Sequence, residues 1–326
     1  MSTRRRTLSG LGAGVAGALA AGGLGPFAAG DARAAAPQQG PLWPEVYRFR
    51  LGAFEITCLL DGKIAMDGPH PIFGQDRTPE EVVELCRANF LPGNRFVNGF
   101  TPLLVNTGRE IVLIDTGNGA ARRPQAGRLR ELLGRLGIAP WQVDVVAITH
   151  FHPDHIGGLM EDGAPAFPNA RIFAGRVEYE FWTAEERLSG PTENTAKLVR
   201  ANVVPLSERI TFLEDGQEVV PGITAMSAFG HTPGHLVFHI ESEGRRLLMW
   251  ADTANHYVVS VQRPDWHVRF DMDKQAAAAT RRRIFDMCAA ERLPVAGYHM
   301  PFPALGFVER TAESWRFLPA TYQFEV

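Results

Sequence analysis

Apolar and polar positions alternate along two early segments of the chain, residues 46–51 and 54–60, which flank Gly52. Alternation with a period of two is typical of a half-buried β-strand, and both segments are rich in β-branched and aromatic residues. The second segment ends at Asp61-Gly62, a pair that favours a turn. We therefore predict a β-hairpin over residues 46–60.

The pattern loosens between residues 63 and 100, where proline and glycine are frequent and one helix is predicted over residues 79–89. A connection of this length in a compact domain is usually functional or mobile. It contains four phenylalanines, which fit either the core or an apolar wall beside a site. We assign most of them to the core and keep Phe100 as a candidate pocket residue.

Strand and helix patterns alternate through the rest of the chain, with no long linker and no internal repeat. This order predicts an α/β fold in one domain, residues 35–326. The expected elements are a hairpin over 101–114, a helix over 127–136, strands over 145–149 and 171–174, helices over 177–186 and 193–203, and strands from 210 onward that include 236–240 and 247–250.

Residues 1–34 differ in composition from the rest of the chain. Arg4, Arg5 and Arg6 precede a weakly apolar run of glycine and alanine, and Ala32-Arg33-Ala34 fits a small-residue cleavage site. A run so rich in glycine and alanine makes a poor permanent membrane span. We predict a cleavable twin-arginine-type signal peptide over residues 1–34 and a periplasmic or secreted product without a stable membrane anchor.

Charge narrows the range of partners. The full chain carries a net charge of −3, and four arginines against one aspartate in the leader leave the remaining chain at −6. A net acidic body lacks the electrostatic footprint of a protein that binds nucleic acid or anionic membrane. A small-molecule partner is the expectation that remains.

The cysteines Cys58, Cys86 and Cys288 stand apart from the histidine-rich segments and form no Cys-x-x-Cys pair. We predict buried free thiols, with one disulfide as the alternative for an exported protein. No chemistry is assigned to them.

Three histidines and an aspartate crowd the loop that follows the strand at residues 145–149. His150 and His152 project to the same side because side chains alternate along extended backbone, whereas a turn at Pro153 redirects Asp154 and His155. Asp154 alone would suit a helix start, but histidines clustered at this spacing are typical of metal ligands. One loop can therefore supply ligands to two metal ions.

Four more candidate ligands stand at turns or strand ends in the second half of the chain: His231, His235, Asp252 and His299. His231 and His235 bracket a tight turn made by glycine and proline. We predict His235 as the ligand because it opens the next strand, and assign His231 to supporting the turn by hydrogen bonding. The expected set is His150, His152 and His235 on one metal, Asp154, His155 and His299 on the other, and Asp252 shared.

Asp115 ends the predicted hairpin over residues 101–114. A carboxylate at this place can orient a metal-bound histidine from behind. It can equally cap its own turn. Both interpretations stay open on the sequence alone.

The motifs His150-x-His152-x-Asp154-His155 and Gly230-His231-Thr232-Pro233-Gly234-His235, together with Asp252 and His299, resemble those of the metallo-β-lactamase superfamily. Residues 54–57, 61–62, 166–170, 181–182 and 299–303 are similar to its methyl parathion hydrolase-like branch over nearly the whole mature length. The resemblance implies a four-layer αββα sandwich, two divalent metals at one edge and, in many members, a homodimer.

The resemblance also implies a pocket wall at Trp182, where the family uses an aromatic residue. Residues 63–100 and 253–273 depart from the pattern of that branch, and we expect them to shape the substrate pocket through Phe100 and Trp266. Nitrogen and oxygen donors fit zinc, and they also tolerate manganese, cobalt or iron.

The predicted function is a dinuclear metal-dependent hydrolase in which a bridging hydroxide attacks an ester, lactone or phosphotriester. Asp252 would fix the metal pair, and Asp154 would both ligate and accept a proton. The alternative is an acyl-homoserine lactone lactonase. A β-lactamase is disfavoured because no cysteine stands at a ligand position, a nuclease by the acidic charge, and a non-catalytic metal-binding protein by the complete ligand set.

Overall fold

The computed structural model describes residues 38 and 40–320. The signal peptide predicted over residues 1–34 lies outside this part and stays a prediction. The architecture below is that of the compact unit that begins at Trp43.

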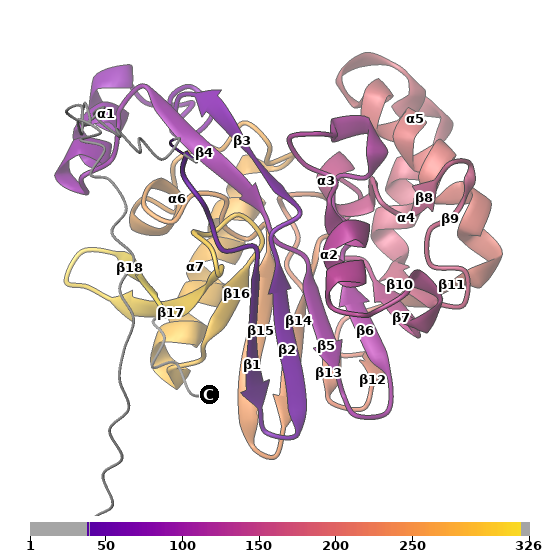
Figure 1. Ribbon diagram of the computed structural model, residues 1–326. Helices are drawn as coiled ribbons and strands as arrows, with labels where there is room; N and C mark the ends of the chain where they lie inside the picture. Colours follow the sequence, from indigo (N-terminus) through magenta and orange to yellow (C-terminus); the bar gives the residue numbers. More distant parts are fainter. Residues whose placement is uncertain (1–37, 39, 321–326) are drawn as a thin grey trace, which may run out of the picture. The chain divides into compact units, whose positions relative to one another are not determined.

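Two large β-sheets form the centre of this unit (Figure 1). The first sheet has, in spatial order, β1 (Val46–Leu51), β2 (Phe54–Leu59), β5 (Leu103–Asn106), β6 (Ile111–Ile114), β7 (Val145–Ala147), β10 (Arg171–Gly175) and β11 (Ile210–Leu213). The second has β12 (Glu218–Val220), β13 (Ile223–Ser227), β14 (Leu236–Ser242), β15 (Arg245–Ala251), β16 (Val295–Gly297), β17 (Leu305–Arg310) and β18 (Trp315–Pro319). Two small hairpins stand apart from them, β3 (Gly62–Asp67) with β4 (Arg95–Phe100), and β8 (Met160–Glu161) with β9 (Ala164–Pro165).

The described residues also form seven helices. They are α1 (Pro79–Ala88), α2 (Leu129–Arg135), α3 (Pro153–Ile156), α4 (Arg176–Thr183), α5 (Glu193–Asn202), α6 (Val259–Gln262) and α7 (Lys274–Glu291). Short 3-10 turns occupy Ala120–Arg122, Pro140–Gln142, Glu185–Leu188, Gly190–Thr192 and Val204–Arg209. Figure 1 shows α2, α4 and α5 on the side of the first sheet and α7 on the side of the second.

The layers follow from the alternation of side chains along each strand. In β15, Leu247 and Met249 enter the cluster between the sheets, whereas Leu248 and Trp250 pack with Phe285 of α7. In β6 the same alternation sends Val112 and Ile114 inward and Leu113 toward α2. Because every strand that buries both faces needs apolar residues at successive positions, the strands read as nearly continuous apolar runs. The predicted αββα arrangement is confirmed.

Most of the predicted elements occur within a few residues of their expected bounds. The hairpin of β1 and β2, the helices α1, α4 and α5, and the strand β10 confirm the periodicity argument. The expectation of a loose connection over residues 63–100 is wrong at both ends, because β3 and β4 pair there as an antiparallel hairpin. Helix α7 lies outside every helix predicted from the sequence.

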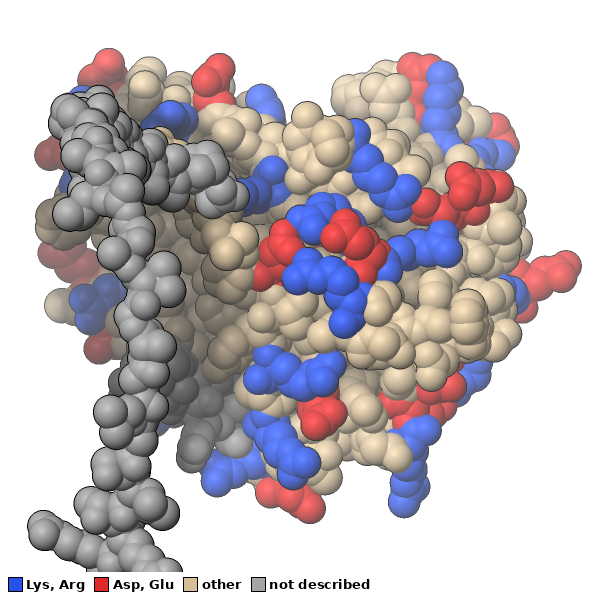
Figure 2. Space-filling view, in the orientation of Figure 1, with Lys and Arg blue, Asp and Glu red and all other residues tan. Residues whose placement is uncertain are grey.

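Cys58, Cys86 and Cys288 are free and buried, which confirms the prediction of unpaired thiols. Among the described residues, no helix combines the length and the apolar character that a membrane crossing requires. On the face shown in Figure 2, basic and acidic side chains are interspersed. Arg310–Asp286 and Arg246–Glu291 are examples of exposed ion pairs in the described part of the chain.

Candidate metal centre

The loop after β7 is shaped by a proline and two glycines. His152 is extended (φ −68°, ψ 154°) because it precedes Pro153, which occupies the first turn of α3. A Cβ atom on Gly157 would lie 2.3 Å from the carbonyl oxygen of Asn118, and one on Gly158 would lie 2.1 Å from that of Thr116. Only glycine therefore permits this close packing of the loop against the neighbouring segment.

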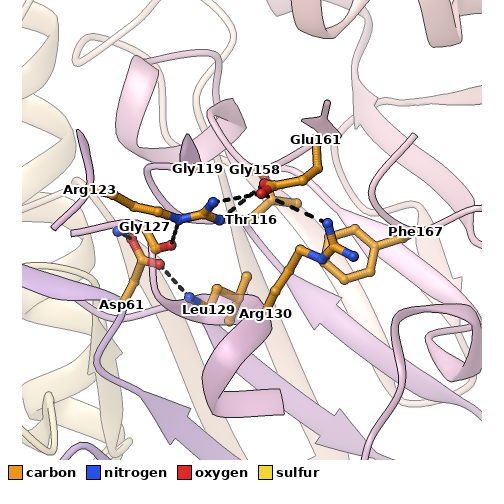
Figure 3. Close-up of a pocket in the computed structure, with 10 residues that line it drawn as sticks. All are labelled: Asp61, Thr116, Gly119, Arg123, Gly127, Leu129, Arg130, Gly158, Glu161 and Phe167. Carbon is orange, nitrogen blue, oxygen red and sulfur yellow. Dashed lines mark hydrogen bonds and ion pairs between the residues drawn. The ribbon is translucent and has the colours of Figure 1, made fainter. Parts of the chain in front are cut away.

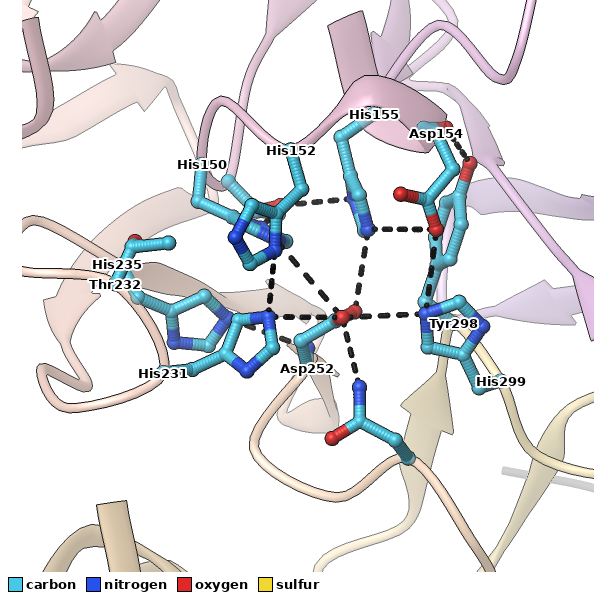
Figure 4. A network of polar contacts seen from close by, with 12 residues as sticks. His150, His152, Asp154, His155, His231, Thr232, His235, Asp252, Tyr298 and His299 are labelled. Atoms are coloured by element: carbon cyan, nitrogen blue, oxygen red, sulfur yellow. Dashed lines mark hydrogen bonds and ion pairs between the residues drawn. The ribbon is translucent and has the colours of Figure 1, made fainter. Parts of the chain in front are cut away.

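Four side chains converge on one point, as Figure 4 shows: His150, His152, His231 and Asp252. Their candidate ligand atoms all lie within 4.8 Å of one another. His231 Nε2 is 2.9 Å from His152 Nδ1 and 3.1 Å from Asp252 Oδ2. Three imidazoles and one carboxylate form a donor set that suits a divalent transition metal.

A second group, formed by Asp154, His155 and His299, lies beside the first. Asp154 Oδ2 is 3.6 Å from His155 Nε2 and 3.5 Å from His299 Nε2. Asp252 stands between the groups, with Oδ1 3.2 Å from His155 Nε2 and Oδ2 3.1 Å from His299 Nε2. One carboxylate therefore faces ligands of both groups.

Unpaired buried atoms test whether these residues suit a metal. His150 Nε2, His155 Nε2 and Asp252 Oδ1 are buried and lack a hydrogen-bond partner among the described residues. Buried polar atoms are otherwise nearly always paired, because an unsatisfied donor or acceptor is costly. His155 Nε2 lies 3.2 Å from Asp252 Oδ1, and His150 Nε2 lies 3.9 Å from Asp252 Oδ2. The unpaired atoms thus gather around Asp252, and the residues fit a pair of divalent cations.

The assignment of the two turn histidines differs from the prediction. His235 Nδ1 lies 2.9 Å from the carbonyl oxygen of Ala228, and its Nε2 accepts the backbone N–H of Asp252 at 3.2 Å. Both ring nitrogens are thus engaged by backbone, and His235 supports the turn. His231 takes the position expected of His235, because its Nε2 faces the first group while Nδ1 lies 2.9 Å from Asp271 Oδ1.

Carboxylates and carbonyls hold the other nitrogen of several candidate ligands. Asp115 Oδ2 lies 2.8 Å from His155 Nδ1, and Asp115 also accepts from the backbone N–H of Thr149 at 2.9 Å. His299 Nδ1 lies 2.8 Å from the carbonyl oxygen of Gly99. Such contacts fix the tautomer and the direction of an imidazole, and Asp115 is placed to do this for His155.

Burial and neighbouring charges shift the pKa values of the candidate histidine ligands in opposite directions. Burial and the nearby His231 lower the pKa of His152 to about 3, so this imidazole is neutral. Burial also lowers the pKa of His231, but the charges of Asp252 and Asp271 outweigh it and raise the pKa to about 9. Because only a neutral imidazole binds metal, His231 has to release a proton when a cation binds.

A family comparison agrees with this geometry. Residues 101–294, more than half of the chain, match the family model described as the metallo-beta-lactamase superfamily. The chain belongs to this superfamily. An N-acyl homoserine lactonase of a Bacillus species is 29% identical over 153 residues, which are 44% of this chain and 54% of that protein. The chain thus spans about half the length of the curated relatives it matches.

Solved structures of the superfamily match over a longer range. AidC, described as a dizinc quorum-quenching lactonase in complex with an acyl-homoserine product, is 26% identical with a TM-score of 0.78. The match covers 86% of this chain and 98% of that one. A hydrolase of the same superfamily, AbOPH, is 26% identical with a TM-score of 0.80, over 87% of this chain and 100% of that one.

The three residues expected at the substrate pocket of this superfamily member occupy different environments. Phe100 and Trp182 are 2% exposed, and their rings lie 5.6 Å from that of His299 and 6.2 Å from that of His152. They therefore back the candidate ligands from the core and do not form an open pocket wall. Trp266 packs in a separate apolar cluster with Phe73 and against the side chain of Arg77.

Several residues at the centre were missed on the sequence. Asn255 Nδ2 donates to Asp252 Oδ2 at 2.8 Å, and the Tyr298 hydroxyl donates to the backbone carbonyl of Asp154 at 2.5 Å. Buried Arg281 of α7 donates to Asp271 at 2.7 Å. Tyr298 could have been proposed from the sequence, because it is an aromatic residue directly before the candidate ligand His299. No local pattern marks Arg281, because its role depends on a helix that meets a distant loop.

A hollow near Asp61 shows a different kind of polar site (Figure 3). The buried Asp61 carboxylate accepts hydrogen bonds from Asn118, Gly127 and Leu129, while Arg123 pairs with Glu161 at its rim. These charged groups are satisfied by protein partners. None of the candidate metal ligands lines the hollow. The hydrogen bonds of Asp61 and the ion pair of Arg123 hold the surrounding loops together.

Proposed function

We propose that this protein is a hydrolase that uses two divalent cations to open a lactone or cleave a related ester of a small molecule. The observation that supports this most strongly is the position of Asp252. Its two oxygens face His155 on one side and His231 and His299 on the other, at 3.1 to 3.2 Å. A shared carboxylate of this kind holds two cations close together.

The first cation would be held by His150, His152 and His231, and the second by Asp154, His155 and His299. Two divalent cations held by these residues would lower the pKa of a water molecule and would offset the negative charge that develops on a substrate oxygen. Zinc is proposed as the metal, which the dizinc description of AidC supports. Manganese, cobalt and iron suit the same donors.

Asp154 is the proposed proton acceptor. Its side chain is 15% exposed, whereas that of Asp252 is 4% exposed, so Asp154 is the carboxylate that a water molecule or substrate reaches more readily. Burial raises its pKa, but the charges of His155 and His299 outweigh this and lower it, which keeps the group ionised. The hydrogen bond from Tyr298 to its backbone carbonyl fixes the start of α3, from which Asp154 projects.

Lactones are the proposed substrate class because a relative named N-acyl homoserine lactonase and a solved structure described as a quorum-quenching lactonase resemble this chain. Aryl esters and phosphotriesters are the second candidate. They rest on the similarity of residues 54–57 and 299–303 to the methyl parathion hydrolase-like branch. Both classes need the same attack by water on an electrophilic centre.

The test uses the full-length chain loaded with zinc and assayed on N-hexanoyl-homoserine lactone, a p-nitrophenyl ester and paraoxon. We expect two zinc ions per chain, hydrolysis of the lactone and a loss of at least about 100-fold in kcat/KM for Asp252→Asn. Asp286→Asn is the matched control, because Asp286 forms an exposed ion pair with Arg310.

A folded protein with two zinc ions that hydrolyses none of the three substrates would overturn the proposed function. Hydrolysis of paraoxon without hydrolysis of the lactone would favour the second candidate.

A further inference from the structure

Glu178, in the first turn of α4, is a buried carboxylate outside the ligand set. Its Oε1 accepts the backbone N–H of Phe151 and the indole N–H of Trp182, both at 2.8 Å. Its Oε2 accepts the hydroxyl of Thr232 at 2.7 Å and the backbone N–H of Gly234 at 2.9 Å. Four donors thus converge on one side chain.

Three of these donors, Phe151, Thr232 and Gly234, come from the two segments that carry the histidines of the first group. Phe151 stands between His150 and His152, and Thr232 directly follows His231. Trp182 adds a third link, because its ring packs 6.2 Å from the ring of His152. The carboxylate of Glu178 therefore spans the gap between the loop after β7 and the turn before β14.

The backbone of α4 packs so closely against the turn before β14 that there is no room for a side chain at Gly234. A Cβ atom on Gly234 would lie 2.2 Å from the backbone nitrogen of Glu178. All four partners donate, and an ionised carboxylate is the side chain that only accepts. A glutamine in its place would turn an NH₂ group toward one pair of donors. The site thus requires the carboxylate itself, although burial raises the pKa of Glu178.

We propose that Glu178 is a positioning residue that sets the spacing between His150, His152 and His231 and so determines the affinity of the first cation. The inference rests on the proposed two-cation function. The second group has separate supports, Asp115 behind His155 and the carbonyl of Gly99 behind His299. Loss of the Glu178 carboxylate should therefore weaken the binding of the first cation and leave the binding of the second unchanged.

The test compares Glu178→Gln with Asp61→Asn in the full-length chain. Asp61 is the matched control because it is equally buried and accepts four hydrogen bonds, from Asn118 twice, Gly127 and Leu129. None of its donors belongs to the segments that carry the first group. Metal-free protein is titrated with zinc against a chromophoric chelator, and the thermal midpoint of each metal-free variant is recorded.

Glu178→Gln is expected to lower the affinity for one of the two zinc ions about 10- to 100-fold, which is the usual effect of removing a group that supports a metal ligand. The affinity for the other zinc ion should change by no more than about twofold. Asp61→Asn is expected to lower the thermal midpoint without separating the two affinities. Thr232→Val removes a single hydrogen bond and should give a smaller loss at the same cation, which keeps the test available if Glu178→Gln does not fold.

The inference is overturned if Glu178→Gln and Thr232→Val lower the affinity for both zinc ions equally, or change neither affinity. The carboxylate would then contribute only to the stability of the fold. Zinc affinity is measured without a substrate. A wild-type protein that binds two zinc ions but hydrolyses nothing would therefore refute the proposed function and leave the role of Glu178 intact.

Discussion

Replacing Asp271 with asparagine tests how a buried charge network controls a metal ligand. Asp271 Oδ1 lies 2.9 Å from His231 Nδ1, and its Oδ2 accepts from Arg281 at 2.7 Å. Arg281 is 1% exposed and Asp271 is 2% exposed. The substitution preserves side-chain volume but removes the charge that both cationic partners face.

Two separate losses are expected from Asp271→Asn. Removing one partner of a buried ion pair costs about 3–5 kcal/mol, and the oxygen that asparagine retains places the loss near the lower end, about 3 kcal/mol. The imidazole of His231 also loses the carboxylate that orients it, which weakens metal binding about 10- to 100-fold, or about 1.4–2.8 kcal/mol. Denaturant unfolding of the metal-free protein measures the first loss, and zinc titration measures the second.

A double variant separates the two effects. Asp271→Asn with Arg281→Met removes the uncompensated guanidinium, although the carbonyl of Pro264 then loses the donor that contacts it at 2.7 Å. Leaving that carbonyl unpaired costs about 1 kcal/mol, so about 2 kcal/mol of stability should return. Zinc affinity should stay low. Recovery of zinc affinity together with stability would refute a specific role of Asp271 behind His231.

Three further predictions concern the second cation, metal removal and the thiols. Asp115→Asn should lower the affinity for one zinc ion about 10- to 100-fold, because His155 loses its carboxylate partner. An equal loss of affinity for both zinc ions would contradict this. Chelation should lower the thermal midpoint and two equivalents of zinc should restore it, since free zinc at 100 times Kd stabilises by about 2.7 kcal/mol; an unchanged midpoint would contradict bound metal. Burial raises the pKa of Cys86 to about 11 and that of Cys288 to about 12, above the value of 9.0 for an unperturbed thiol. The stability that neutral thiols contribute is therefore present below pH 9 and is lost as the pH rises toward 11. Native protein at pH 8 should react slowly with a thiol reagent, and rapid labelling before unfolding would contradict burial.

Local patterns were sufficient for most of the fold. The alternation along β1 and β2 and the apolar run of β7 predicted these strands, because burial of strand faces imposes a period that the sequence shows directly. Helix α7 was missed because its first third, residues 274–279, is mostly alanine and gives little contrast between faces. The pairing of β3 with β4 was missed because the two strands are separated by helix α1 and by loops that contain Pro69, Pro71 and Pro92.

The ligand set was predicted less completely than the motifs suggested. Both His231 and His235 stand on one turn, and the choice between them depends on which ring nitrogen meets backbone, a property of three-dimensional geometry alone. Glu178, Asp271 and Arg281 are charged residues that the sequence gives no reason to bury. Their partners lie up to 56 residues away along the chain, as for Gly234 and Glu178.

The proposed function requires that two groups of side chains hold two cations, with Asp252 between them. Anomalous diffraction at the zinc edge, from crystals of the zinc-loaded protein, tests this directly. We expect two peaks, one bounded by His150, His152 and His231, the other by Asp154, His155 and His299. A single peak, or a peak coordinated by His235, would contradict the account.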